Sequence, residues 1–249
     1  MTTTGQPTGN SARVRLRLLA AFLPVTAALY VGAEALNPKG TDQVVTSTAV
    51  ALRLLPVAAA HSSQLYLSGS LSVVALAGLA VSYAAIAALV TGRGWVIATI
   101  AAVLGGLGAF AGAVFNVLVG VGLAAAASAH TTQLAVARVL ATSFGSRPAE
   151  VAEVVYFVGE YTAPVVMGYA LWRSRRAPRW LAVLFTAGLL LAESMGAIGP
   201  KVVLYALPFA VAMILLAVRI WRAAAGPAPT TDPEPSDHPG QLAGSSKEI

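Results

Sequence analysis

The stretch RPAEVAEVVYFVGEYTAPVVMGYALWRSRR, residues 147–176, combines the two features that decide the fold. Its apolar body, 154–172, is long enough to cross a bilayer as an α-helix that rises about 1.5 Å per residue. Yet Glu160 lies inside this body, and a carboxylate near the centre of a membrane costs ~2.5–3.5 kcal/mol. The stretch therefore predicts a spanning helix that turns its acid into a helix bundle or a wet cavity.

A polar stripe runs along one side of this helix. Glu153, Tyr156, Glu160 and Pro164 follow one another at i, i+3, i+7 and i+11, and residues at these spacings share one helical face. The stripe predicts an internal polar site. It does not specify the chemistry of that site.

Composition extends the membrane prediction to the whole chain. The 249 residues are 57% hydrophobic and only 10% charged, whereas about 25% of the residues in a soluble domain are charged. The net charge is +6, but the arginines stand in short clusters beside apolar segments, which is typical of topology signals and not of a nucleic-acid surface. Cysteine is absent, which excludes disulfides, Cys-ligated metals and thiol catalysis.

The apolar segments predict an all-α integral membrane bundle over 13–223. Two further segments, 41–60 and 131–145, are amphipathic and are predicted to lie on the outer surface. Polar ends, 1–12 and 224–249, are predicted to be disordered. The six predicted spanning helices are 18–36, 70–90, 95–126, 154–172, 180–198 and 202–221.

Charge asymmetry predicts the orientation in a cell membrane. Arginines gather at the ends of segments that the six-helix arrangement places on one side, and this bias marks the cytoplasmic side, so both termini are predicted to be cytoplasmic. The first apolar segment also has the layout of a cleaved signal peptide, ending in Ala33-Glu34-Ala35, and the sequence leaves that alternative open. The arginines are Arg13, Arg15, Arg17, Arg93, Arg173, Arg175, Arg176, Arg179, Arg219 and Arg222.

Glycines in the third predicted span indicate close helix packing. Gly108 and Gly112 have the small-xxx-small spacing that lets two helices approach closely in lipid, and Gly105 and Gly106 stand just before them. A phosphate-binding loop is not indicated, because no strand precedes these glycines.

A basic turn with a proline joins two late helices, within ALWRSRRAPRWLAVLFTAG at 170–188. This stretch resembles the domain-of-unknown-function 4386 family of actinobacterial multipass membrane proteins. The opening is also similar, with an arginine-led helix reaching Val31-Gly32-Ala33-Glu34 and then a loop containing Gly40 and Asp42. The resemblance covers the layout of roughly 13–222 and implies architecture only.

Six residues are the predicted ligand contacts. Glu160 and Glu193, counted from the outer boundary of their helices, both lie roughly 8–9 Å deep at 1.5 Å per residue, and the other four are near that level or on the same stripe. The prediction is an outward-facing acidic pocket that binds or translocates a small or lipophilic molecule. The six residues are Glu160, Glu193, Tyr156, Glu153, Asn116 and Lys201.

Two alternatives stay open on the sequence alone. The acids can serve only to fix helix packing, in a structural subunit with no ligand. The chain can instead be a membrane-embedded enzyme acting on a lipid or isoprenoid-like substrate, with a metal held by His61, His130, Glu153 and Glu160. No His-x-x-x-His or Glu-x-x-His spacing supports that metal site, so no cofactor and no metal is predicted. The expected partners are the lipid bilayer and either a small lipophilic ligand or a membrane partner protein, and no nucleic acid.

Overall fold

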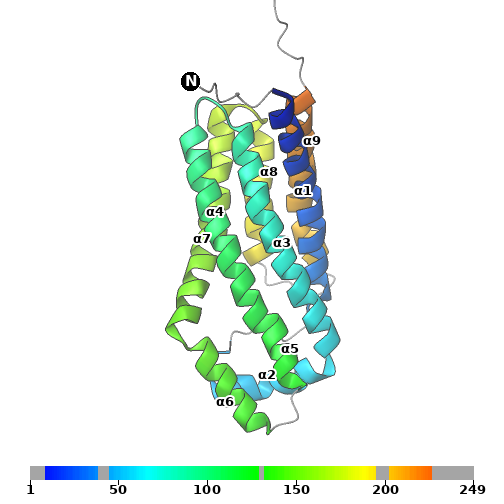
Figure 1. The fold of residues 1–249 in the computed structure, drawn as a ribbon, viewed down its shortest axis with the longest axis vertical. Coiled ribbons are helices and arrows are strands. Elements are labelled where there is room, and N and C mark those ends of the chain that lie inside the picture. The colour runs from blue at the N-terminus through cyan, green and yellow to red at the C-terminus, as the bar shows by residue number, and fades with distance from the viewer. Residues whose placement is uncertain (1–8, 39–44, 129–131, 195–201, 226–249) are drawn as a thin grey trace, which may run out of the picture.

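The computed structural model describes residues 9–38, 45–128, 132–194 and 202–225. These residues form an elongated bundle of helices, and no strand occurs among them (Figure 1). In chain order the elements are α1 (Gly9–Leu36), α2 (Thr48–Ala60), α3 (Ser62–Leu89), α4 (Trp95–Asn116), the π-helix η1 (Val117–Gly122), α5 (Leu123–Ala127), α6 (Gln133–Phe144), α7 (Arg147–Ser174), α8 (Arg179–Ser194) and α9 (Val202–Ala225).

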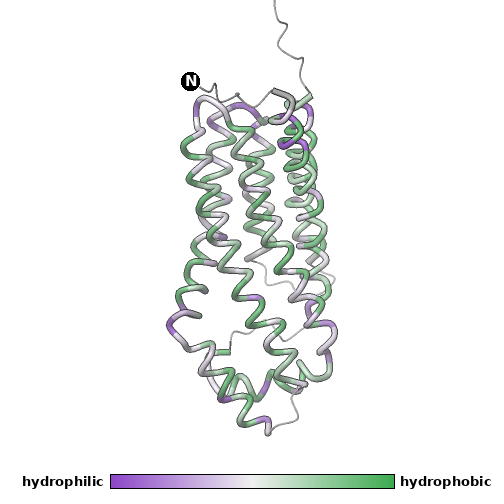
Figure 2. The backbone as a smooth tube through the Cα atoms, viewed as in Figure 1, coloured by the Kyte–Doolittle hydropathy of each residue, from purple (hydrophilic) through white to green (hydrophobic). Residues whose placement is uncertain are grey.

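The predicted all-α fold is confirmed for the described residues, and the lengths agree with a membrane bundle. The described part of α8 has 16 residues, about 24 Å at 1.5 Å per residue, which is shorter than the ~30 Å apolar layer. Figure 2 shows hydrophobic residues over most of the helix bodies. Five helical runs are long and apolar enough to span, namely Ser11–Leu36, Ser62–Leu89, Trp95–Ala127, Arg147–Ser174 and Val203–Ala225.

One end of the bundle collects arginines from four places in the chain. They come from the start of α1, the turn between α3 and α4, the turn between α7 and α8, and the end of α9. We call this the arginine-rich end, and the opposite end, where α2 and α6 lie, the α2–α6 end (Figure 1). The arginines at the first end are Arg13, Arg15, Arg17, Arg93, Arg173, Arg175, Arg176, Arg179, Arg219 and Arg222.

Small residues let the main core pack tightly around three aromatic rings. Tyr83, Phe185 and Phe209 are almost fully buried, and the rings of Tyr83 and Phe185 meet edge to face with centroids 6.2 Å apart. The backbone of Gly188 lies so close to Phe209 that an added Cβ would come within 2.5 Å of its amide nitrogen. Phe185 also contacts Phe209, with ring centroids 6.4 Å apart, so the three rings join α3, α8 and α9.

A second, smaller core closes the α2–α6 end. Leu54 of α2, Leu123 of α5 and Leu140 and Phe144 of α6 are buried together. The predicted apolar face of the segment 131–145 is thus confirmed at Leu140 and Phe144, but Leu134 is 47% exposed. Leu134 stands one residue after the start of α6, beyond the reach of this core.

Helix boundaries differ from the predictions at three places. The first helix begins at Gly9, inside the predicted tail 1–12, because extending an existing helix adds one backbone hydrogen bond per residue. In the described part of the amphipathic segment 41–60, which begins at residue 45, the helix starts at Thr48, where the Ser47 hydroxyl accepts a hydrogen bond from the Val50 amide at 3.3 Å. Helix α9 continues to Ala225, inside the predicted tail 224–249, and the rest of that tail lies outside the described residues.

The third predicted span is one continuous helical run, but it contains a π-helical segment, η1, that the sequence pattern did not predict. The segment lies beside α3, where a Cβ added at Gly120 would stand 2.9 Å from the Gly69 Cα. A π-turn inserts a residue into the helical ladder and is frequent at functional sites.

Candidate functional site

Glu160 is the only charged side chain that is buried among those the structure describes. It is 7% exposed and lies near the middle of α7, directly after Gly159. The prediction that the stripe on this helix turns its acid away from lipid is met at this residue. Four residues later, Pro164 is also buried.

A small cavity adjoins Glu160 where four helices meet. Tyr83 of α3, Gly105 and Gly108 of α4, Tyr156 of α7 and Leu189 of α8 line it together with Glu160. Its volume is about 10 Å³, close to the smallest space that holds one water molecule. The cavity therefore has room for a water molecule or an ion of similar size beside the carboxyl group, and not for a lipophilic molecule.

Glycines on α4 and α7 create this meeting point. A Cβ added at Gly108 would lie 2.8 Å from the Gly159 Cα, so the two backbones are in contact at the crossing. Tyr83 covers Gly105 and Tyr156 covers Gly112 so closely that a Cβ on either glycine would stand 2.5 Å from a ring carbon. The packing role predicted for the glycines of the third span is thus what the structure shows at these positions.

An aromatic chain leads from the site toward the α2–α6 end. The Tyr156 ring stacks on Phe115 with centroids 6.0 Å apart, and Phe115 meets Phe144 edge to face at 6.4 Å. Tyr156 thus lines the cavity of Glu160 and also contacts the aromatic group that reaches the second core. The two cores are therefore connected through side chains.

The remaining predicted contacts do not line this cavity. Asn116 is half-buried and donates its Nδ2 hydrogen bond to the Gly112 carbonyl of its own helix, at 3.0 Å. Glu153 is half-buried two turns before Glu160. Glu193 lies in the last described turn of α8, four residues after Leu189, and Lys201 lies outside the described residues. Among the predicted residues whose side chains the structure describes, Glu160 and Tyr156 are the two that line the cavity.

The four residues of the alternative metal site do not form a cluster in the described part of the chain. His61 is exposed at the start of α3, and its Nδ1 lies 3.1 Å from Gln64 Oε1, while His130 lies outside the described residues. Within those residues, no three His, Asp or Glu side chains come together in a way that could hold a metal ion.

Sequence reasoning missed Tyr83, Gly105 and Gly159 as site residues. Tyr83 stands alone in an apolar helix, and a single tyrosine there is equally compatible with core packing. Gly159 directly precedes Glu160, and a glycine beside an intramembrane acid was a signal that another backbone approaches at that level. Which helix approaches could not be read from the spacing.

Comparison with known proteins does not identify a relative. No family model matches the chain, and neither the search of curated proteins nor the search of solved structures gives a significant match. Membership of the domain-of-unknown-function 4386 family therefore stays a prediction.

Proposed function

We propose that the chain is a cell-membrane protein with six spanning helices, α1, α3, the α4–α5 run, α7, α8 and α9, and with both termini in the cytoplasm. The arginine-rich end supports this orientation, because arginines mark the cytoplasmic side. At the α2–α6 end the described arginines are Arg53, Arg138 and Arg147. In this arrangement α8 is the shortest span.

The proposed function is to bind a single proton at Glu160, with one water molecule, as a step in the binding or translocation of a small molecule. The observation that carries it is the buried carboxyl group beside a cavity of about 10 Å³. Calcium and magnesium ions generally need six or more oxygen ligands. The side-chain oxygens that line this cavity are those of Glu160, Tyr83 and Tyr156, which suits a proton better.

Protonation would control packing at this level of the bundle. Burial of an ionised carboxyl group at the closed crossing of Gly108 and Gly159 costs more than burial of a neutral one, and water or separation of the helices lowers that cost. The half of α7 before Gly159 is mostly exposed, and its movement away from α4 would break the contacts of Tyr156 with Gly112 and Phe115. Loss of the proton therefore favours an arrangement opened toward the α2–α6 end.

The test compares Glu160→Gln with Glu150→Gln, which removes an exposed acid from the first turn of the same helix. Thermal unfolding of the purified protein is measured from pH 5 to pH 9. In the wild type, we expect stability to depend on pH, with a slope of at most about 1.4 kcal/mol per pH unit for one proton bound at Glu160. Glu160→Gln should lose this slope, and Glu150→Gln should keep it.

A structural role for Glu160 is the second candidate, and the backbone contact between Gly108 and Gly159 favours it. In that case Glu160 serves only to fix the crossing of α4 and α7. The two candidates give different results. An unchanged pH slope in Glu160→Gln would reject the proton site and leave the structural role.

A further inference from the structure

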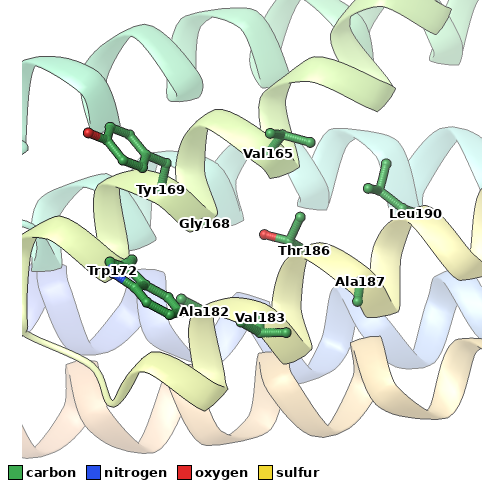
Figure 3. A pocket seen from close by; sticks show the side chains of 9 residues that line it. All are labelled: Val165, Gly168, Tyr169, Trp172, Ala182, Val183, Thr186, Ala187 and Leu190. Carbon is green, nitrogen blue, oxygen red and sulfur yellow. The ribbon is translucent and has the colours of Figure 1, made fainter.

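An apolar hollow lies between α7 and α8, and Glu160 is not among the residues that line it. It is an open groove of about 540 Å³. Figure 3 shows Tyr169 and Trp172 near one end of the groove and Val165 and Leu190 near the other, with Thr186 between them. Val165 to Trp172 is seven residues, about 10 Å along a helix, so the groove runs through roughly one leaflet of a bilayer.

Small residues keep the groove hollow. Gly168 contributes no side chain, and a Cβ at this position would collide with the Thr186 hydroxyl oxygen. That hydroxyl donates a hydrogen bond to the Pro164 carbonyl at 3.0 Å. The Thr186 hydroxyl group therefore has its hydrogen-bond partner within the protein. Ala182 and Ala187 complete an apolar surface, which fits an acyl chain.

Two arginines stand at the aromatic end of the groove. The Arg179 guanidinium lies over the Trp172 ring, 5.0 Å from its centroid, and Arg173 Nη1 donates a hydrogen bond to the Tyr169 hydroxyl at 3.3 Å. Each cation is thus held by an aromatic side chain that lines the groove. The acids whose side chains the structure describes lie elsewhere, namely Glu34, Glu150, Glu153 and Glu160, so none of these four carboxylates competes for the two arginines.

The same arrangement occurs at a second groove of about 330 Å³ between α1 and α9. Trp221 and Arg222 line that groove, and the Arg17 guanidinium lies 5.7 Å from the centre of the Trp221 ring. Arg17 Nε is buried with no hydrogen-bond partner in the described part of the chain. Two apolar grooves therefore each end in a tryptophan covered by an arginine, both at the arginine-rich end.

We propose that the groove between α7 and α8 is a binding site for an anionic phospholipid. One acyl chain lies along Val165, Gly168 and Ala187. The phosphate lies at Arg173 and Arg179, whose guanidinium groups suit phosphate oxygens. Basic pockets between spanning helices at the cytoplasmic side are known to bind anionic head groups, and the aromatic residues fix the depth of the arginines.

The experiment measures lipid binding to the purified full chain in an uncharged detergent, by native mass spectrometry and by the shift in melting temperature. The probes are phosphatidylglycerol, phosphatidylcholine with the same acyl chains, and glycerol phosphate, which has no acyl chain. We expect binding and a raised melting temperature with phosphatidylglycerol, much weaker effects with phosphatidylcholine, and none with glycerol phosphate.

Matched variants separate the charge from the groove. Arg179→Gln should weaken phosphatidylglycerol binding about fivefold, whereas Arg15→Gln, an exposed arginine of the same end that lines no described groove, should not. Ala187→Phe should fill the groove and displace the lipid. Its control is Ala84→Phe, an exposed position on α3 outside the groove.

Four results would overturn the proposal. Equal binding of phosphatidylglycerol and phosphatidylcholine would mean that the groove holds acyl chains without regard to charge. Competition by glycerol phosphate would mean a soluble-anion site. An equal loss in Arg179→Gln and Arg15→Gln would mean general surface charge, and an equal loss in Ala187→Phe and Ala84→Phe would mean that the groove is not involved.

Discussion

The two halves of α7 have opposite environments within one continuous helix. From Arg147 to Val158 the only buried residue is Ala149, whereas eight of the residues from Gly159 to Leu171 are buried. Figure 1 shows the first half of α7 diverging from the α4–α5 run toward the α2–α6 end. A single helix thus passes from a surface position into the centre of the bundle.

The difference arises from the partners and not from the hydrophobicity of α7. Val151, Val154 and Val158 are as apolar as residues of the second half, yet each is exposed by half or more. The second half has Gly159 and Gly168, which admit the backbone of α4 and the side chain of Thr186. Burial along this helix follows from where small residues allow close approach.

Glu160 stands at the boundary between these halves, one residue inside the close crossing. A change in the charge of Glu160 therefore acts at the point where tight packing ends. We expect the exposed half of the helix to move in response. We therefore expect the segment of α7 after Glu160 to be rigid and the segment before Glu160 to be movable.

The largest effect is expected from closing the crossing. Gly159→Leu places a branched side chain against the Gly108 backbone, and since backbone cannot be displaced as a side chain can, we expect a loss of more than about 3 kcal/mol in unfolding free energy. The control is Gly106→Leu in α4, where a Cβ meets nothing within 4 Å. Thermal unfolding in detergent measures both.

If Gly159→Leu and Gly106→Leu lowered stability equally, the crossing of α4 and α7 would not be the contact that makes the second half of α7 rigid. The contrast between the two halves would then have to come from α8.

Much of this architecture could be predicted from the sequence because apolar length and turn residues are local signals. The turn after α3 contains Gly92 and Gly94, both with positive φ, and the basic turn after α7 contains Arg175 in the same backbone region. The sequence also predicted that Glu160 turns into the bundle or a wet cavity, because an acid inside an apolar segment must avoid lipid.

The partners of Glu160 could not be predicted, because they depend on which helix faces meet. Counting depth from helix ends placed Glu160, Glu193 and Asn116 together, yet Asn116 bonds to its own helix and the cavity is completed by Tyr83 of α3. Depth is a single coordinate, whereas contact also requires the rotation of each helix about its axis. The π-helix η1 changes the rotation of side chains about the helix axis within the α4–α5 run. No residue spacing in the sequence predicted this π-helix.

A second, somewhat smaller effect would test whether the two cores unfold separately. Phe144→Ala removes a buried ring from the second core, at a cost of about 3 kcal/mol. We expect hydrogen exchange to rise most in α2 and α6 while α3 and α9 keep their protection, because Phe144 belongs to the second core, whereas α3 and α9 contribute many of the buried residues of the main core.

Phe185→Ala is the matched variant, since Phe185 is fully buried in the main core. It should raise hydrogen exchange throughout α3, α8 and α9. Equal protection patterns in Phe144→Ala and Phe185→Ala would show that the molecule unfolds as one unit, and the first half of α7 would then not be independently movable.

The smallest effect concerns the tie between α8 and the rigid half of α7. Thr186→Val keeps the side-chain shape but removes the hydrogen bond to the Pro164 carbonyl, and we expect a loss of about 1 kcal/mol. Thr99→Val is the control, because the Thr99 hydroxyl bonds only to the Trp95 carbonyl of its own helix and should cost less. Hydrogen exchange in Thr186→Val should rise after Gly159 and stay unchanged before it. A rise in hydrogen exchange confined to the first half of α7 would contradict the assignment of rigidity to the second half. The hydrogen bond that Thr186→Val removes ends at Pro164, which lies in the second half.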